Sequence, residues 1–288
     1  MDRRQFITAT TSLLLAAPAV GAAAPDLRDT IERLERRSGG RLGVAVHDSA
    51  TGRHFAWRAD QTFPLCSTFK FLLVAALLRN ADRGREHLAR IVPIAGDDLL
   101  PNSPFTKTRV GRGASVAELC RAAIVDSDNA AANLLLPAID GPAGFTRFAR
   151  SLGDGVTRLD RVEPTLGQAE PGDPRDTSSP AAMLADMKRV LLGQVLSPAS
   201  RRRLTAWLLA CRTGKARLRA GFPIGWRVGD KTGSGMHGTS NDIAIAWPAR
   251  GGRPLLVVAY LTGASVDAPL RDSILASVGR AVATLPLG

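Results

Sequence analysis

The chain has few residues of the kinds that bind metal ions. Its 288 residues include three cysteines and four histidines, and none of them forms a CxxC pair, an HExxH motif or another zinc-ligand spacing. The sequence therefore excludes a zinc hydrolase, and we expect neither a metal ion nor a cofactor. The odd number of cysteines leaves at least one thiol unpaired, and Cys66 and Cys120 lie beside apolar helical residues. We expect no disulfide.

Lysines and aromatic residues are also scarce. Five of the 38 basic residues are lysines, and 14 residues are aromatic. Because the arginines are spread along the chain and form no dense basic run, the net charge of +12 does not indicate a nucleic-acid-binding protein. A hydrophobic content of 45% with 22% charged residues is typical of a globular protein. The length suits one large domain or two interlocked ones.

No hydrophobic run is long enough to span a membrane. The apolar stretch over residues 7–20 is interrupted by threonines, a serine and a proline. The paired arginines Arg3 and Arg4 precede it, and the small residues 22–24 follow it, as at a signal-peptidase site. Residues 1–24 are therefore interpreted as a signal peptide, by the twin-arginine route or, alternatively, as an ordinary Sec signal. We expect a periplasmic or secreted product.

The pattern of apolar residues predicts strands at both ends of the mature chain and helices between them. Predicted helices cover 26–37, 68–80, 116–136, 180–195, 198–211 and 269–284, and predicted strands cover 41–47, 53–57, 226–230, 241–247 and 254–261. This order indicates an α/β (α+β) fold with an antiparallel sheet flanked by helices and an inserted all-helical domain. We assign 25–62 with 211–288 to the sheet domain and 63–210, including the 158–177 loop, to the helical domain. A cleft between the two is the natural place for a site.

Four short motifs follow one another along the chain: Ser67-Thr68-Phe69-Lys70, Ser127-Asp128-Asn129, Glu163-Pro164 and Lys231-Thr232-Gly233. A serine hydroxyl becomes a nucleophile when a base removes its proton, and Lys70 lies one helical turn from Ser67. Burial near Lys231 would lower the pKa of Lys70, and a helix N-terminus favours an oxyanion. Taken alone, Ser67 is also compatible with a helix N-cap and Ser127 with a turn, so the order and spacing of the motifs carry the argument.

Ser-x-x-Lys, Ser-Asp-Asn and Lys-Thr-Gly together mark class A β-lactamases and penicillin-binding proteins. The chain resembles a class A serine β-lactamase over residues 26–287, and the resemblance extends through residues 127–136, 159–166 and 171–177. It implies hydrolysis of the β-lactam amide bond of penicillins and cephalosporins through a serine acyl-enzyme, which gives antibiotic resistance. It also implies a β-lactamase/transpeptidase-like fold, and we expect a monomer that acts on small molecules and binds neither membrane nor nucleic acid.

The resemblance implies a role for each matching residue. Ser67 would attack the β-lactam carbonyl, Lys70 would assist proton removal, and Ser127 would pass a proton to the departing nitrogen. Glu163 would activate the water that hydrolyses the acyl-enzyme. Whether Lys70 or Glu163 is the acylation base stays open.

Further matches concern substrate binding and the loop that carries Glu163. The backbone N–H groups of Ser67 and Ser234 would form the oxyanion hole, and Arg217 would lie near the substrate carboxylate, unless it is one of the many surface arginines. The remaining substrate-binding matches are Asn129, Lys231, Thr232, Gly233 and Ser234. The loop-holding matches are Arg161, Asp176 and Asn133, and Glu163–Pro164 matches a cis peptide bond.

Several positions depart from the family pattern. Asn102 replaces an aromatic residue at the cleft wall, and Gly167 replaces an asparagine that helps to hold the deacylating water. Cys66 precedes the nucleophile as in several extended-spectrum and carbapenem-hydrolysing members. The positions of the usual disulfide partners of Cys66 and Cys120 are held by Gly235 and Val74. Substrate preference and inhibitor sensitivity are therefore left open.

Two other functions compete with hydrolysis. A penicillin-binding transpeptidase or carboxypeptidase shares the fold and three motifs but lacks the Glu163 loop. A non-catalytic cell-wall-binding module would be expected to lose Ser67, Lys70 or Lys231, and all three are present.

Overall fold

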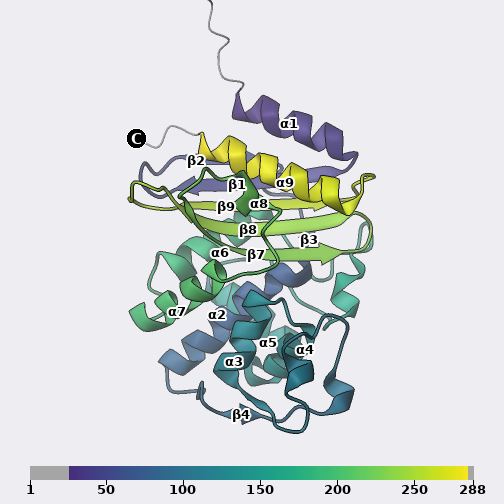
Figure 1. The fold of residues 1–288 in the computed structure, drawn as a ribbon, viewed down its shortest axis with the longest axis vertical. Coiled ribbons are helices and arrows are strands. Elements are labelled where there is room, and N and C mark those ends of the chain that lie inside the picture. Colours follow the sequence, from purple (N-terminus) through teal and green to yellow (C-terminus); the bar gives the residue numbers. More distant parts are fainter. Residues whose placement is uncertain (1–25, 285–288) are drawn as a thin grey trace, which may run out of the picture.

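A five-stranded sheet combines both ends of the chain. The computed structural model describes residues 26–284, so the predicted signal peptide at 1–24 lies outside the described residues. The strands are β1 (Arg41–Asp48), β2 (His54–Trp57), β7 (Arg227–Gly235), β8 (Thr239–Trp247) and β9 (Leu255–Thr262). They pair antiparallel in the order β2-β1-β9-β8-β7 (Figure 1). This arrangement confirms the predicted fold class.

Helices cover both faces of the sheet because successive apolar residues of each strand point to opposite faces. Leu42, Val44 and Val46 of β1 pack with Ile31 of α1 (Leu27–Ser38), as do side chains of α8 (Leu218–Gly221) and α9 (Ala268–Ala283). Ala45 belongs to the core on the opposite face, with α6 (Pro180–Leu191) and the helical part. Figure 1 shows α1 and α9 above the sheet and the other long helices below it.

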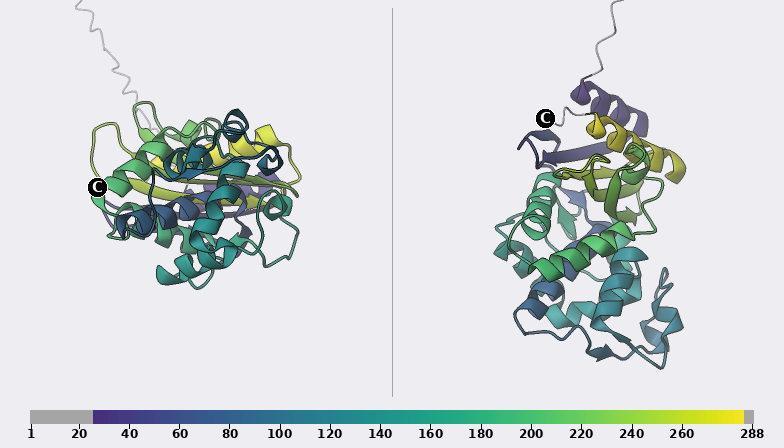
Figure 2. Two further views of the ribbon diagram at one scale, coloured as in Figure 1. Left: turned by 90° about the horizontal axis from the view of Figure 1, so that it is seen from below. Right: turned by 60° about the vertical axis from the view of Figure 1, so that its left-hand side comes forward.

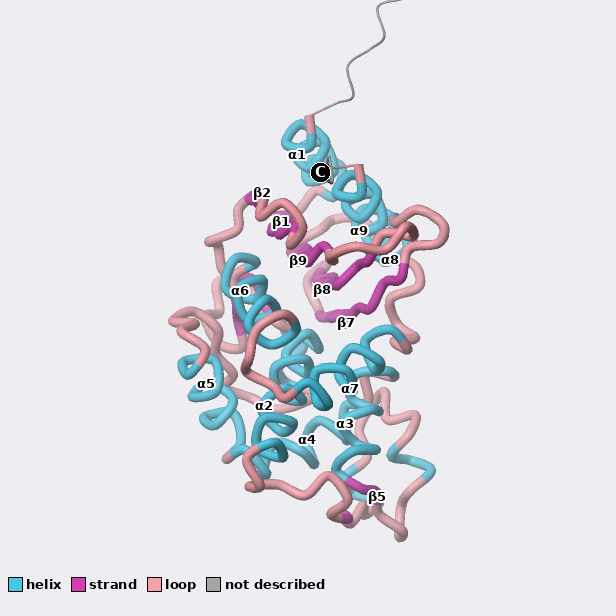
Figure 3. Tube along the Cα trace, turned by 90° about the vertical axis from the view of Figure 1, so that its left-hand side faces the viewer, coloured by secondary structure: helices cyan, strands magenta, loops and turns pink. Residues whose placement is uncertain are grey.

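The helical part is built around α2 (Phe69–Asp82). Residues 69–78 are all buried, because α2 is apolar on every side and other helices surround it. These helices are α3 (Val116–Val125), α4 (Asn129–Leu135), α5 (Gly141–Ser151) and α7 (Pro198–Leu209). Two short ladders complete it: β3 (Phe63–Pro64) with β6 (Thr177–Ser178), and β4 (Ile91–Val92) with β5 (Ala114–Ser115). The right view of Figure 2 and Figure 3 show the helical part beneath the sheet. Within residues 26–284, no helix has the length and apolar character needed to cross a bilayer.

Two predicted elements differ from the structure in ways that shape the site. The helix predicted over 116–136 is wrong as one element, because the chain breaks between α3 and α4 at Ser127, whose φ is +54°. The Asp128 carboxylate accepts a hydrogen bond from the Ala131 N–H and begins α4 anew. The strand predicted over 226–230 continues to Gly235 as β7, which brings Lys231 and Gly233 into the sheet edge.

Candidate active site

Ser67 lies in a tight turn that β7 contacts. The 3₁₀ turn Cys66–Thr68 leads into α2, and the Thr68 hydroxyl donates to the Leu65 carbonyl at 2.6 Å. A Cβ at Gly233 would lie 3.0 Å from the Leu65 carbonyl oxygen and 3.2 Å from the Cys66 Cβ. The glycine of Lys-Thr-Gly therefore permits the close approach of β7 to the turn that presents Ser67.

Lys70 is fully buried and joins the predicted catalytic residues. Its Nζ lies 3.0 Å from Ser67 Oγ, 3.1 Å from Glu163 Oε1 and 2.9 Å from the Ser127 carbonyl oxygen. It also donates to Asn129 Oδ1 at 2.5 Å. Burial lowers the pKa of Lys70, and the Glu163 carboxylate opposes this shift. The surroundings thus favour a neutral amine more than water does.

Ser127 lies between the two buried lysines. Lys231 Nζ is 2.9 Å and Lys70 Nζ is 3.5 Å from Ser127 Oγ. Burial and the neighbouring Lys70 lower the pKa of Lys231 to about 7. A proton can therefore pass between the Ser127 hydroxyl and either amine over hydrogen-bond distances.

Glu163 reaches the same centre from its loop. Its Oε1 lies 3.2 Å from Ser67 Oγ, and the Glu163–Pro164 peptide bond is cis. Asn133 holds the Glu163 backbone from both sides, because its Nδ2 donates to the carbonyl at 2.8 Å and its Oδ1 accepts from the N–H at 3.0 Å. This pair of hydrogen bonds fixes Glu163 against α4.

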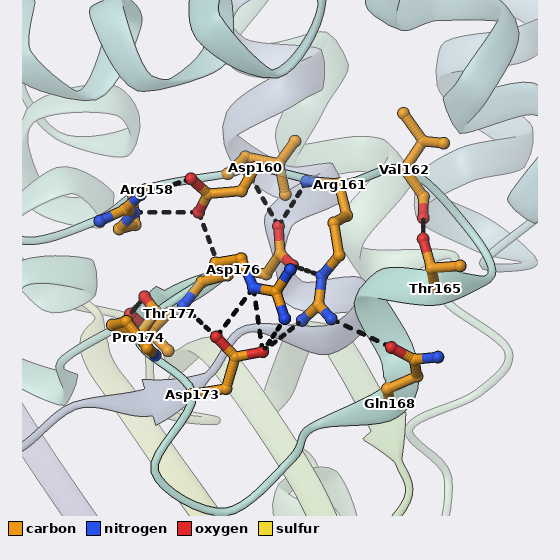
Figure 4. A network of polar contacts seen from close by, with 12 residues as sticks. Arg158, Asp160, Arg161, Val162, Thr165, Gln168, Asp173, Pro174, Asp176 and Thr177 are labelled. Carbon is orange, nitrogen blue, oxygen red and sulfur yellow. Dashed lines mark hydrogen bonds and ion pairs between the residues drawn. The ribbon is translucent and has the colours of Figure 1, made fainter.

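An ion pair closes the loop behind Glu163. Arg161 Nε lies 2.5 Å from Asp176 Oδ2, and Asp176 Oδ1 accepts from the backbone N–H groups of Asp160 and Arg161. Asp173 lies 3.4 Å from the same guanidinium (Figure 4). Asp176 is 1% exposed, so removing Arg161 would leave a buried charge without its partner.

Arg217 is buried rather than a surface arginine. Its guanidinium donates to the Gly233 carbonyl at 2.7 Å and to Ser234 Oγ at 2.7 Å, and it pairs with Asp272 at 2.7 Å. The nearby Thr232 hydroxyl lies 2.5 Å from that of Thr213. Arg217 and Lys231 therefore bring a guanidinium group and an amine to the part of β7 that carries Ser234.

The sequence did not predict two contacts of this region, one made by Asn102 and one between His237 and Glu170. Asn102 donates to the Ser127 carbonyl at 2.9 Å, and its carbonyl accepts from the Asn129 N–H at 2.9 Å, so it holds the Ser-Asp-Asn turn. His237 pairs with Glu170 at 3.2 Å and joins the β7–β8 hairpin to the Glu163 loop. Neither contact has a sequence signal, because each joins segments far apart along the chain.

The cysteines are free and buried. Burial, assisted by Glu163, raises the pKa of Cys66 to about 12, so its thiol stays protonated and unreactive at neutral pH. Within the part of the chain that the structure describes, no cluster of three metal-ligating side chains occurs.

The fold, and a serine hydroxyl within hydrogen-bond distance of a buried lysine and a carboxylate, define the class of serine hydrolases that act through an acyl-enzyme. The family model of the Beta-lactamase enzyme family matches residues 26–285, and the chain belongs to this family as a class A β-lactamase that hydrolyses β-lactams. The chain is 46% identical to Beta-lactamase L2 of Stenotrophomonas maltophilia, over 92% of this chain and 88% of that protein. It is 43% identical to Beta-lactamase CTX-M-8 of Citrobacter amalonaticus, over 96% and 94%. An ancestral class A β-lactamase structure (GNCA) superposes with a TM-score of 0.88 at 58% identity, over 89% of this chain and 98% of that one.

Proposed function

We propose that Ser67 is the nucleophile of β-lactam hydrolysis. The observation that supports this most is the position of Ser67 Oγ, 3.0 Å from Lys70 Nζ and 3.2 Å from Glu163 Oε1. Either group can accept the hydroxyl proton directly, so both remain candidates for the acylation base. As Ser67 Oγ bonds to the carbonyl carbon, the backbone N–H groups of Ser67 and Ser234 stabilise the oxyanion.

Ser127 then delivers a proton to the ring nitrogen as the amide bond breaks. The Ser127 hydroxyl can recover that proton from Lys70 or Lys231, which lie 3.5 and 2.9 Å away. Glu163 takes a proton from a water that attacks the acyl carbon, and Ser67 leaves with a proton returned to its oxygen. The enzyme ends the cycle in its starting state.

The end of β7 binds the substrate carboxylate in this proposal. Lys231, Thr232, Ser234 and Arg217 surround it, with Gly233 allowing the approach of the strand, and Asn129 holds the substrate's side-chain amide. An anion beside Lys231 would favour its protonated form, because an opposite charge raises the pKa of an ammonium group. Arg161, Asp176 and Asn133 hold the loop that carries Glu163.

We also propose a location, an oligomeric state and a domain division for the protein. The exported protein is a periplasmic or secreted monomer that binds neither membrane nor nucleic acid. Residues 25–62 with 211–288 and residues 63–210 form its two domains. Size-exclusion chromatography of the mature protein, and detection of it outside the cytoplasm, would test the first two points.

Intact-mass spectrometry separates hydrolysis from the function of a penicillin-binding protein. We expect Ser67→Ala to abolish turnover of a chromogenic cephalosporin and to form no adduct with benzylpenicillin. We expect Glu163→Ala to accumulate a covalent penicilloyl adduct, because Ser67 and the oxyanion donors remain while the deacylation base is lost. Glu32→Ala, at an exposed carboxylate on α1, is the control. Full turnover by Glu163→Ala without an adduct would contradict the role of Glu163.

A further inference from the structure

A cavity lies at the edge of the sheet opposite the predicted catalytic residues. β7, which carries Lys231, forms one edge of the sheet, and β2 forms the other. The cavity, of about 640 Å³, lies between β1, β2 and α6, and its walls include Ala45, Ala56, Leu184 and Leu192. Figure 3 shows α6 below β1 and β2. Its size and mostly apolar lining are those of small-molecule sites.

The register of β1 and β2 places two histidines on the face that this cavity adjoins. Residues paired across antiparallel strands share a face, and His47 pairs with His54 just as Ala45 pairs with Ala56. A Cβ at Gly43, also on this face, would meet Pro180 at the start of α6. Both histidines line the cavity, and their rings stack with centroids 4.5 Å apart.

His47 has an unsatisfied polar atom. The residue is 5% exposed, and within residues 26–284 its Nδ1 has no hydrogen-bond partner. Burial lowers the pKa of His47, as do the charges of Lys188 and His54, while Asp48 and a hydrogen bond with the Arg53 backbone oppose the shift. A buried nitrogen without a partner costs free energy that a ligand can recover.

The rim of the cavity is cationic. Lys188 and Arg189 of α6 line it and are exposed, and its lining contains no aspartate or glutamate. Among the residues that the structure describes, Lys188 makes no ion pair with a carboxylate. An apolar wall beside an uncompensated ammonium group is complementary to a molecule with an apolar chain and one negative charge.

We propose that this cavity binds an aliphatic monocarboxylate, with the carboxylate between Lys188 and the His47–His54 pair and the chain along the alanine and leucine wall. The site is independent of β-lactam hydrolysis. Because a bound carboxylate favours the protonated imidazole, binding takes up a proton at His47 and becomes tighter as the pH falls.

Isothermal titration calorimetry of the mature protein with octanoate tests the proposal. We expect saturable binding of one octanoate, weaker by about tenfold or more in Ala185→Phe, which fills the cavity. We expect Lys188→Gln to weaken it by about fivefold, the upper range for a partly exposed ion pair. The matched controls Ala199→Phe and Lys107→Gln, at exposed positions outside the cavity, should bind as the wild type does. All four variants should hydrolyse a chromogenic cephalosporin at the wild-type rate.

Four results would overturn the proposal. The first is an absence of binding by the wild type, and the second is unchanged binding by both Ala185→Phe and Lys188→Gln. The third is equal affinity for octanol, which would remove the role of the carboxylate. The fourth is competitive inhibition of cephalosporin hydrolysis by octanoate with a constant equal to its dissociation constant, which would place it in the hydrolytic site.

Discussion

Replacing Asp186 by asparagine should change how the stability of the protein depends on pH. Asp186 of α6 is fully buried, and neither of its carboxyl oxygens has a hydrogen-bond donor among the described residues. Burial and the neighbouring Asp154 raise the pKa of Asp186 to about 9. Although burial opposes it, hydrogen bonds from Thr157 and Val156 hold the pKa of Asp154 below its ordinary value. At neutral pH Asp186 is therefore protonated while Asp154 is ionised.

The sign of the effect follows from the raised pKa. In the unfolded chain Asp186 titrates near its ordinary value of 3.8, so above that pH unfolding releases a proton. The contribution of Asp186 to the free energy of unfolding is therefore greatest below pH 4 and is lost as the pH rises towards 9. Each pH unit in this window lowers the free energy of unfolding by about 1.4 kcal/mol. Between pH 5 and pH 8 it therefore falls by about 4 kcal/mol. Asparagine is neutral throughout and can donate to Asp154, so Asp186→Asn removes this loss.

Urea unfolding of both proteins at pH 5, 6.5 and 8 gives the measurement. We expect the free energy of unfolding of Asp186→Asn, relative to wild type, to rise by about 4 kcal/mol across this range. Asp60→Asn, at an exposed position, should show no such trend. A difference between wild type and Asp186→Asn that stays constant with pH would show that Asp186 is already ionised in the folded protein and would refute the reasoning.

Three further predictions concern the site and its surroundings. Gly167→Asn should speed deacylation of small penicillins by about tenfold, the factor of ~1.4 kcal/mol, and slow turnover of bulky cephalosporins. A Cβ at Gly167 has no heavy atom within 4 Å, so the side chain has room, and a fall in both deacylation rates, measured in single turnovers, would contradict the water-positioning argument. Glu170→Gln should lower the KM for a bulky cephalosporin by about twofold to fivefold, since it releases the hairpin at His237 from the loop. An unchanged KM would show that the His237–Glu170 contact does not restrict the cleft. Unreduced mature protein should bind about three equivalents of a thiol reagent when denatured and almost none when native, because all three cysteines are free and buried, and one equivalent on denaturation would reveal a disulfide.

The sequence by itself determined the sheet strands, most of the long helices and the family. Apolar periodicity reports which faces of a segment are buried, so the sheet strands and the buried helix α2 were predictable from their own residues. Three of the four motifs supply residues that contact Lys70, and the fourth supplies Lys231, which contacts Ser127. The apolar pattern over 116–136 predicted a single helix. The turn-forming residues at Ser127 instead end one helix and begin the next.

Only the tertiary structure decided what surrounds these residues. The Asn102 contacts, the His237–Glu170 pair and the influence of Asp154 on the pKa of Asp186 each join segments that are distant along the chain. Such contacts depend on where the strands and loops pack, and periodicity carries no information about partners from another element. The cavity beside His47 also depends on tertiary packing, because the register of β1 with β2 and the position of α6 together form its walls.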